Sequence, residues 1–189
     1  MKTRALKTKK GFTLIETLVA IAIFAFSITG LISITATGVF DTNFVKNKFT
    51  ASYLAMEGVE LVRNIRDTAA VSGQSWGVII NDPTLLEQCF DDKVCMIDPD
   101  PQPDFDSPII PAECPGAICP ALSYRKSEAS FNYDLPDNVD NLQSIFVRTI
   151  NMQLISPFEA RVISRVEWNQ GSELRHVEFS FNLLDWPSP

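Results

Sequence analysis

The chain has 189 residues, of which 46% are hydrophobic, so disorder is excluded as its dominant state. Five of the 16 basic residues lie within the first ten positions, where no acidic residue occurs. The remaining chain holds 11 basic against 23 acidic residues, a formal net charge of about −12. Because phosphate-backbone binding requires clustered Lys and Arg, this acidic body is not expected to bind nucleic acid.

An apolar segment follows the basic start. Residues 17–40 contain no charged side chain, and as a helix they would extend roughly 36 Å, enough to cross a hydrocarbon core of about 30 Å. The excess of basic residues lies on the N-terminal side, so the positive-inside rule places Met1 in the cytoplasm and the acidic body outside. Glu16 lies just inside the start of this segment, where a carboxylate is energetically costly and usually has a partner.

Three interpretations of this segment differ in whether and where the chain is cleaved. A cleaved secretory signal would have its best cleavage site after Ile34-Thr35-Ala36 and would release a soluble secreted protein near Ala36. A plain signal anchor would stay uncut, with Glu16 near the interface by accident. Neither of these two interpretations explains Glu16.

The sequence KKGFTLIE at residues 9–16 resembles the processing site of type IV prepilins and type II secretion pseudopilins. The resemblance implies that a membrane-embedded prepilin peptidase cuts between Gly11 and Phe12, removes residues 1–11 as a basic leader, and methylates the Phe12 amine. Cleavage would create an ammonium group about one helical turn before Glu16. The resemblance also implies that Glu16 pairs with the Phe12 amine of the adjacent subunit during filament assembly.

A long helix is predicted from Phe12 to about Asp67, because no proline occurs before Pro83. We expect residues 12–40 to form its transmembrane or filament-core part and residues 41–68 an amphipathic part. The apolar stripe of the second part consists of Ala51, Leu54, Ala55, Gly58, Leu61, Val62 and Ile65. This stripe is expected to pack on a small globular head.

Three small residues in the apolar part bear on its role. Gly30 and Gly38 are compatible with local bending, or with nothing more than small side chains on a crowded helix face. Many major pilins carry a proline midway along this part, whereas this chain has Ser33 at that position. The departure argues against a major-pilin role.

The middle of the chain, residues 69–120, is expected to be a loop region rich in Pro and Asp, with little regular structure. It contains all four cysteines, Cys89, Cys95, Cys114 and Cys119, and an even number outside the cytoplasm suggests two disulfides. Of the three possible pairings we favour the local pairs, Cys89–Cys95 and Cys114–Cys119. No metal site is expected, because these spacings differ from those of structural zinc sites.

The acidic sequence DPDPQPDFD at residues 98–106 lacks the glycine of an EF-hand loop, and the twelfth position from Asp98 is Ile109 instead of Glu. A solvated acidic loop is therefore favoured over a calcium site. Surface loops often carry binding functions, so a specific partner would bind here, within residues 83–120.

Residues 121–189 are expected to form an antiparallel β-sheet head. Three segments alternate between apolar and polar residues, namely 143–155, 159–169 and 173–184. NQGS at residues 169–172 is predicted to join the last two as a hairpin, and ALSYRK at 121–126 to add a strand. The apolar faces of the last two segments consist of Val162, Val166 and Trp168, and of Val177, Phe179, Phe181 and Leu183.

One-sided strands need a cover on their apolar face, and the helix stripe would supply it. The predicted fold class is therefore α+β, with a long N-terminal helix packed by its C-terminal half on an antiparallel sheet. ASYLAMEGVELVRNIRD in the helix, FVRTI, and the closing RVEWNQGSELRHVEFSFNLLDW look like PilV-type minor pilins and the related pseudopilin of secretion systems.

The resemblance implies a pilin-like fold and a structural subunit of a type IV pilus or type II secretion-like filament, located near its tip. It implies a single-pass membrane protein that later joins an extracellular filament. The implied partners are prepilin peptidase, other pilins or pseudopilins, the inner-membrane assembly platform and the membrane. No cofactor is expected.

No enzymatic motif stands out. The sequence lacks a G-x-S-x-G elbow, a phosphate loop, an H-E-x-x-H motif and a dinucleotide fingerprint, and its only histidine, His176, falls on the polar face of a predicted strand. We therefore expect a substrate of prepilin peptidase and not an enzyme. The alternative function is a membrane-anchored extracytoplasmic binding or adhesion module that uses the 83–120 loop.

Overall fold

In the computed structural model of the protein, the described residues are 11–99, 109–134, 137 and 139–185. The predicted basic leader, apart from Gly11, and most of the predicted acidic loop at 98–106 lie outside them.

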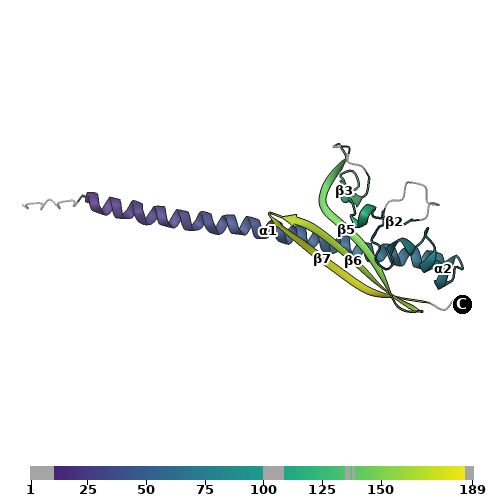
Figure 1. The fold of residues 1–189 in the computed structure, drawn as a ribbon. Coiled ribbons are helices and arrows are strands. Elements are labelled where there is room, and N and C mark those ends of the chain that lie inside the picture. Colours follow the sequence, from purple (N-terminus) through teal and green to yellow (C-terminus); the bar gives the residue numbers. More distant parts are fainter. Residues whose placement is uncertain (1–10, 100–108, 135–136, 138, 186–189) are drawn as a thin grey trace, which may run out of the picture. The chain divides into compact units, whose positions relative to one another are not determined.

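Helix α1 extends without interruption from Leu14 to Val71 (Figure 1). The prediction of one continuous helix is confirmed, and the helix continues four residues beyond Asp67. It ends at Val71, and Gly73, two residues later, has a φ of +81°, the left-handed conformation in which glycine terminates helices. The amides of Gly73 and Gln74 donate to the carbonyls of Ala70 and Ala69, both at 3.0 Å, and so satisfy the last turn.

The chain divides into two units within this helix. The first unit ends at Val45, and its described helical part, residues 14–45, is called the front half of α1. Its side chains are exposed from Leu14 to Asn43, and α1 is long and apolar enough in this part to cross a membrane. The second unit, the head, starts at Lys46 and includes residues 46–71, the rear half of α1.

The rear half of α1 buries one face in the head. All seven residues of the predicted apolar stripe are buried, so that prediction is confirmed. Burial of a Leu or Ile side chain contributes roughly 2 kcal/mol each. Packing of this face therefore fixes the rear half on the sheet more strongly than intrinsic helix propensity does.

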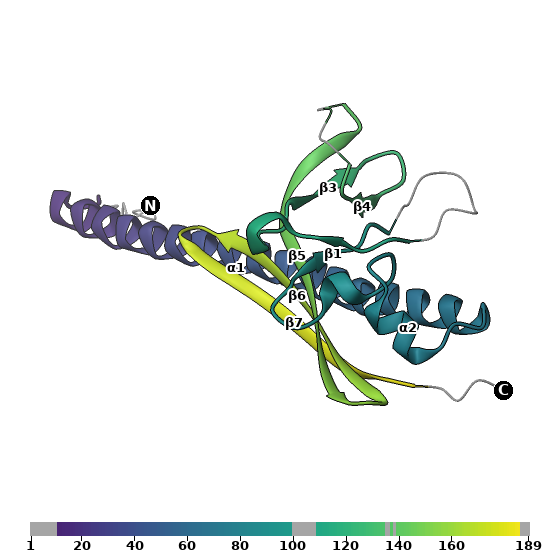
Figure 2. The ribbon, with the colours of Figure 1, turned by 45° about the vertical axis from the view of Figure 1, so that its right-hand side comes forward.

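Three long strands form the centre of the sheet, β5 (Asn141–Ser156), β6 (Glu159–Gln170) and β7 (Glu173–Leu184). They pair antiparallel in sequence order, as the alternating segments predict. Gly171 lies in the turn between β6 and β7 with a φ of +63°, which confirms the predicted hairpin. Figure 2 shows these strands beside the rear half of α1.

Shorter strands complete the sheet, which has 7 strands in the described part of the chain. Strand β3 (Ala121–Arg125), predicted at 121–126, pairs with β5 and with β4 (Ser130–Asn132). Strand β1 (Cys95–Met96) pairs with β5 and with β2 (Ala112–Glu113). The α+β fold predicted from the sequence, a long helix followed by an antiparallel sheet, is therefore present.

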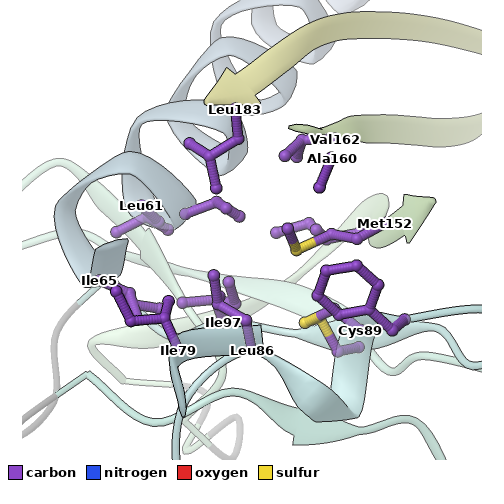
Figure 3. Packing of buried hydrophobic residues seen from close by; sticks show 14 of the residues in the cluster. Leu61, Ile65, Ile79, Leu86, Cys89, Ile97, Met152, Ala160, Val162 and Leu183 are labelled. Atoms are coloured by element: carbon purple, nitrogen blue, oxygen red, sulfur yellow. A yellow bond between two sulfur atoms is a disulfide. The ribbon is translucent and has the colours of Figure 1, made fainter. Parts of the chain in front are cut away.

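The middle of the chain contributes directly to the hydrophobic core. Its regular elements are short, and the longest is helix α2 (Trp76–Asn81). Two 3₁₀ turns, η1 (Glu87–Cys89) and η2 (Pro115–Ala117), follow along the chain. Figure 3 shows Ile79 and Leu86 from this segment packed with Leu61 of α1 and Met152 of β5. The segment is therefore part of the packed head as well as a connection.

Two local disulfides fix this middle segment. Cys89 pairs with Cys95 and Cys114 pairs with Cys119, with Cα–Cα distances of 4.9 and 4.7 Å. This is the pairing favoured from the sequence. All four cysteines are buried, and the Cys89–Cys95 pair belongs to the core cluster. Each disulfide closes a short loop, so each stabilises mainly its own turn of chain.

The apolar row of β7 is covered less completely than the row of β6. Val162, Val166 and Trp168 on β6 are buried, as predicted. On β7 only Leu183 is buried, Val177 and Phe181 are half-buried, and Phe179 is 38% exposed. The reason is that β7 pairs with β6 alone among the described strands, so its side chains have no neighbouring strand on one flank.

Candidate processing and assembly segment

The predicted cleavage site lies immediately before α1. Gly11, Phe12 and Thr13 precede the helix and are exposed, and the Phe12 side chain is 80% exposed. A Cβ atom placed on Gly11 would meet no other atom within 4 Å. The Gly11–Phe12 bond is thus accessible and non-helical, as cleavage of a peptide bond requires.

Thr13 and Glu16 form a reciprocal cap at the start of α1. The Thr13 amide and hydroxyl both donate to Glu16 Oε2 at 3.4 Å, and the Glu16 amide donates to Thr13 Oγ1 at 3.4 Å. This is the capping-box arrangement, in which Thr or Ser is followed three residues later by Glu. The sequence TLIE carries that signature, so Thr13 was recognisable from the sequence, although the interpretation above assigned Glu16 to amine pairing alone.

The cap gives Glu16 a role at the start of the helix that does not depend on cleavage. An uncapped helix start leaves several backbone N–H groups without partners, and its dipole favours a nearby negative charge. The Glu16 carboxylate supplies both an acceptor and that charge in the uncut chain. After a cut at Phe12, the new ammonium group would add a positive charge at the same end, and Glu16 is the acidic residue in the first turn of α1.

Hydroxyl groups within the front half are paired with the backbone of their own helix. Thr17, Ser27, Thr29, Thr35, Thr37 and Thr42 each donate to a carbonyl three or four residues earlier, at 2.7 to 3.1 Å. A hydroxyl satisfied in this way costs less to transfer into hydrocarbon or into an apolar filament core. Six of the seven hydroxyl side chains of the front half are satisfied in this way, so the front half suits an apolar environment.

The front half contains no break at its small residues. Helix α1 passes through Gly30, Ser33 and Gly38, and a Cβ on either glycine would meet no atom within 4 Å. The secretory-signal site at Ile34-Thr35-Ala36 also lies inside this continuous helix.

Arg148 of β5 is fully buried in the head. Its Nη1 donates to Glu57 Oε2 at 2.5 Å and to the Leu54 carbonyl at 3.3 Å, and its Nη2 donates to the Ile97 carbonyl at 2.8 Å. Tyr133 lies 5.8 Å from the guanidinium and donates its hydroxyl to the Arg148 carbonyl. Burial raises the pKa of the Tyr133 phenol above its usual range. This cluster connects α1, β5 and the middle segment.

The described part of the head contains no cluster of side chains suited to holding a metal ion. Among the described residues, no group of three or more His, Cys, Asp or Glu side chains is placed to hold a metal ion. His176 is exposed on β7 opposite Glu167 of β6. The residues that the sequence links to function lie at the start of α1.

A comparison with protein families also points to the N-terminal part of the chain. Residues 6–32 match the family model of the prokaryotic N-terminal methylation motif. The match includes the predicted cleavage bond and Glu16. No curated protein and no solved structure matches the chain significantly.

The matched motif covers the basic start, the processing site and the first part of the apolar helix, and it does not extend into the head. It therefore supports a type IV pilin-like or pseudopilin protein that is processed by prepilin peptidase and assembles with other pilins, with one apolar helix suited to membrane anchoring.

Proposed function

We propose that this protein is a minor pilin or pseudopilin, a structural subunit of a type IV pilus or type II secretion-like filament, located at or near the filament tip. The observation that carries the proposal is the methylation motif at residues 6–32, whose Gly11–Phe12 bond is exposed and non-helical directly before a membrane-length apolar helix. In this proposal prepilin peptidase cuts that bond and methylates Phe12. The N-terminus is cytoplasmic and the head is extracytoplasmic before extraction into the filament.

The absence of an internal proline supports a minor over a major subunit. α1 has Ser33 where the resembled major pilins carry proline, and its hydroxyl-bearing helix remains continuous there. The inner-membrane assembly platform and other pilins or pseudopilins are the proposed partners.

The first experiment determines the N-terminal sequence and the intact mass of the protein recovered from its own cells. The expected product begins at N-methylphenylalanine, Phe12. A product that begins at Thr37 would replace the proposal with a soluble secreted protein. An uncut chain would indicate a plain anchor. Gly11→Leu places a bulky side chain at the cleavage site and should leave the precursor uncut in the membrane; its efficient maturation would contradict the site.

Two substitutions at Glu16 separate helix capping from amine pairing. Glu16→Gln preserves an acceptor for the Thr13 amide but removes the charge, whereas Glu16→Ala removes both. If the carboxylate pairs with the Phe12 ammonium of a neighbouring subunit, both variants are cut at Gly11 and both enter filaments poorly. If Glu16 acts only as a cap, Glu16→Gln assembles normally and Glu16→Ala does not. Quantitative immunoblotting of purified filaments distinguishes the two results.

A second candidate function, an anchored binding or adhesion module, is favoured by exposed apolar side chains beside the disulfides. Ile118 is 77% exposed within the loop closed by Cys114–Cys119, and Ile110 is 52% exposed. Deleting residues 83–120 would also remove Leu86 and Ile97 from the core, so point variants are the better test. Ile118→Lys should then abolish adhesion or secretion while filament assembly persists; unchanged adhesion and secretion would count against this module.

A further inference from the structure

Strand β7 has an unpaired edge of unusual length. It forms 12 consecutive residue pairs with β6 without a register shift, and it pairs with no other described strand. The other outer strands of the sheet are short, with 3 residues in β4 and 2 in β2. A long regular edge presents a row of backbone N–H and C=O groups that can pair with another chain.

This edge lacks three of the features by which proteins often prevent such pairing. Natural edge strands are commonly interrupted by Pro, by a β-bulge or by Lys side chains. The sequence of β7, ELRHVEFSFNLL, contains neither Pro nor Lys, and its pairing with β6 contains no bulge. At one end of the strand Arg66 of α1 donates to the Leu184 carbonyl at 2.8 Å, so the backbone groups open to a further strand are those between residues 174 and 183.

The side chains along the edge also remain incompletely covered. Phe179 is 38% exposed between the half-buried Val177 and Phe181, whereas Ser164, opposite Phe179 on β6, is fully buried. An added strand would extend the apolar row by one position and cover these three side chains. Leu174 and Leu184, 60% and 52% exposed, lie near the two ends of the same strand.

We propose that β7 accepts an extended antiparallel strand from a different subunit of the same assembly, by β-strand addition. The chemistry of β7 defines that strand. The added strand carries apolar residues at three alternate positions, opposite Val177, Phe179 and Phe181. On its other face it has no acidic residue opposite Glu178, because like charges directly opposite each other destabilise a sheet. This inference rests on the proposed filament function.

A second copy of the chain fits this position less well. Two copies joined edge to edge through antiparallel β7 strands are related by a two-fold axis perpendicular to the sheet. The rear half of α1 packs on that sheet, so the rotation would reverse the helix direction in one copy. Subunits extracted from one membrane into one filament share a single helix direction. The occupant is therefore a different subunit.

Amide hydrogen exchange at single-residue resolution tests the pairing. The full-length protein is compared in two forms, alone in detergent and within assemblies recovered from its own cells. Alternate amides between residues 174 and 183 point away from β6, and their exchange should slow at least ~100-fold in the assemblies. Amides of β6 provide the internal reference. Equal exchange of the β7 amides in both forms would overturn the proposal.

Variants give the test a matched control. Phe179→Lys places a charge in the row that the added strand would cover, and should abolish the extra protection of β7 while β6 stays protected. Ile145→Lys changes a 50% exposed apolar residue on β5 and should leave the β7 protection intact. Equal protection of β7 in both variants would contradict the proposed occupant. Protection of the β7 amides in assemblies that contain only this chain would mean that the added strand comes from a second copy of the chain.

The outcomes also separate this inference from the proposed function. A chain cut at Gly11 and incorporated into filaments, but with an unprotected β7, overturns the strand addition alone. An uncut chain whose β7 amides are protected in membrane extracts that contain a different protein keeps the pairing and overturns the filament function.

Discussion

The two halves of α1 belong to one uninterrupted helix and yet suit two different environments. In the front half the side chains are exposed from Leu14 to Asn43, most of them are apolar, and hydroxyl groups bond to the helix's own backbone. In the rear half, a stripe of small and aliphatic residues is buried on the sheet, and the acidic side chain of Glu57 reaches Arg148.

The difference teaches that continuity of secondary structure does not imply a common source of stability. The front half depends on backbone hydrogen bonds and on whichever apolar environment receives it. The rear half depends on tertiary contacts with the sheet. Substitutions in the two halves should therefore have different effects on the unfolding of the head.

The largest effect is expected from Glu57→Ala. This change leaves the fully buried Arg148 guanidinium without its anionic partner, which should lower the free energy of unfolding by about 3 kcal/mol, because an uncompensated buried charge is costly. The matched control is Glu60→Ala, on the next turn of α1. Glu60 pairs with Arg63 at 2.6 Å on the exposed side of the helix, so its loss should cost about 0.5 kcal/mol or less.

Urea unfolding of the full-length protein in detergent, followed by the fluorescence of the buried Trp76 and Trp168, measures both variants. Equal losses of stability in Glu57→Ala and Glu60→Ala would show that the buried ion pair does not contribute as described.

A smaller effect is expected from Gly58→Ala. A Cβ atom at this position would lie 2.4 Å from Ser164 Oγ and 3.1 Å from Arg148 Cδ, so the helix and sheet must separate or repack. Overpacking of this kind costs about 1–3 kcal/mol, against a gain of roughly 1 kcal/mol in helix propensity, so the expected net loss is about 1 kcal/mol, the middle of that range.

Gly38→Ala is the counterpart in the front half. No atom lies within 4 Å of its Cβ position, so the substitution should leave the head's stability unchanged and raise helix content slightly. Thermal unfolding monitored by circular dichroism compares the two variants. A destabilised Gly38→Ala head, or an unaffected Gly58→Ala head, would remove the contrast between the halves.

The third prediction concerns the cap at the start of the front half. Thr13→Val removes the hydroxyl that accepts the Glu16 amide, and should destabilise the first turn of α1 by about 1 kcal/mol. Thr35→Val removes a hydroxyl that only donates to the Leu31 carbonyl, so a change within about 0.5 kcal/mol is expected. Amide exchange at Glu16 and Thr17 should accelerate in Thr13→Val alone; acceleration in neither variant would exclude the cap.

The smallest expected effect is a pH dependence of the stability of the head. The Asp137 carboxylate accepts the amides of Val139, Asp140 and Asn141 at 2.8 to 2.9 Å. The hydrogen bonds from Val139, Asn141 and Asp140 lower the pKa of Asp137 below its ordinary value of 3.8.

The sign of the effect follows from that shift. Because the folded pKa lies below the unfolded value, the stabilisation is complete above the unfolded pKa and is lost as the pH falls through the folded pKa. Asp137→Asn should therefore flatten the fall in head stability below about pH 5, measured by thermal unfolding at a series of pH values. An unchanged slope would mean that the loop carboxylate does not couple to unfolding.

Several features of the protein follow from local sequence pattern. The absence of proline before Pro83 permits one long helix, and the stripe from Ala51 to Ile65 identifies its buried face. Strict alternation identifies β6 and β7, and Gly171 supplies the left-handed turn between them. These features are predictable because each depends on backbone geometry and on neighbours a few residues apart.

Local pattern also reveals the candidate processing segment. Gly11, Phe12 and Glu16 stand in a short motif between basic residues and an apolar run, and that motif is matched at residues 6–32. The Thr13–Glu16 cap was equally accessible from the spacing of the two residues.

Only the tertiary structure decided the rest. Arg148 occupies a core-facing position of β5, and its acceptors come from Leu54, Glu57 and Ile97, which are distant in the sequence. Gly58 must be glycine because Ser164 approaches it from the sheet, not because of its place in the helix. Burial and pairing of this kind depend on which distant segments meet, and a periodic pattern records only that a face is apolar, not what covers it.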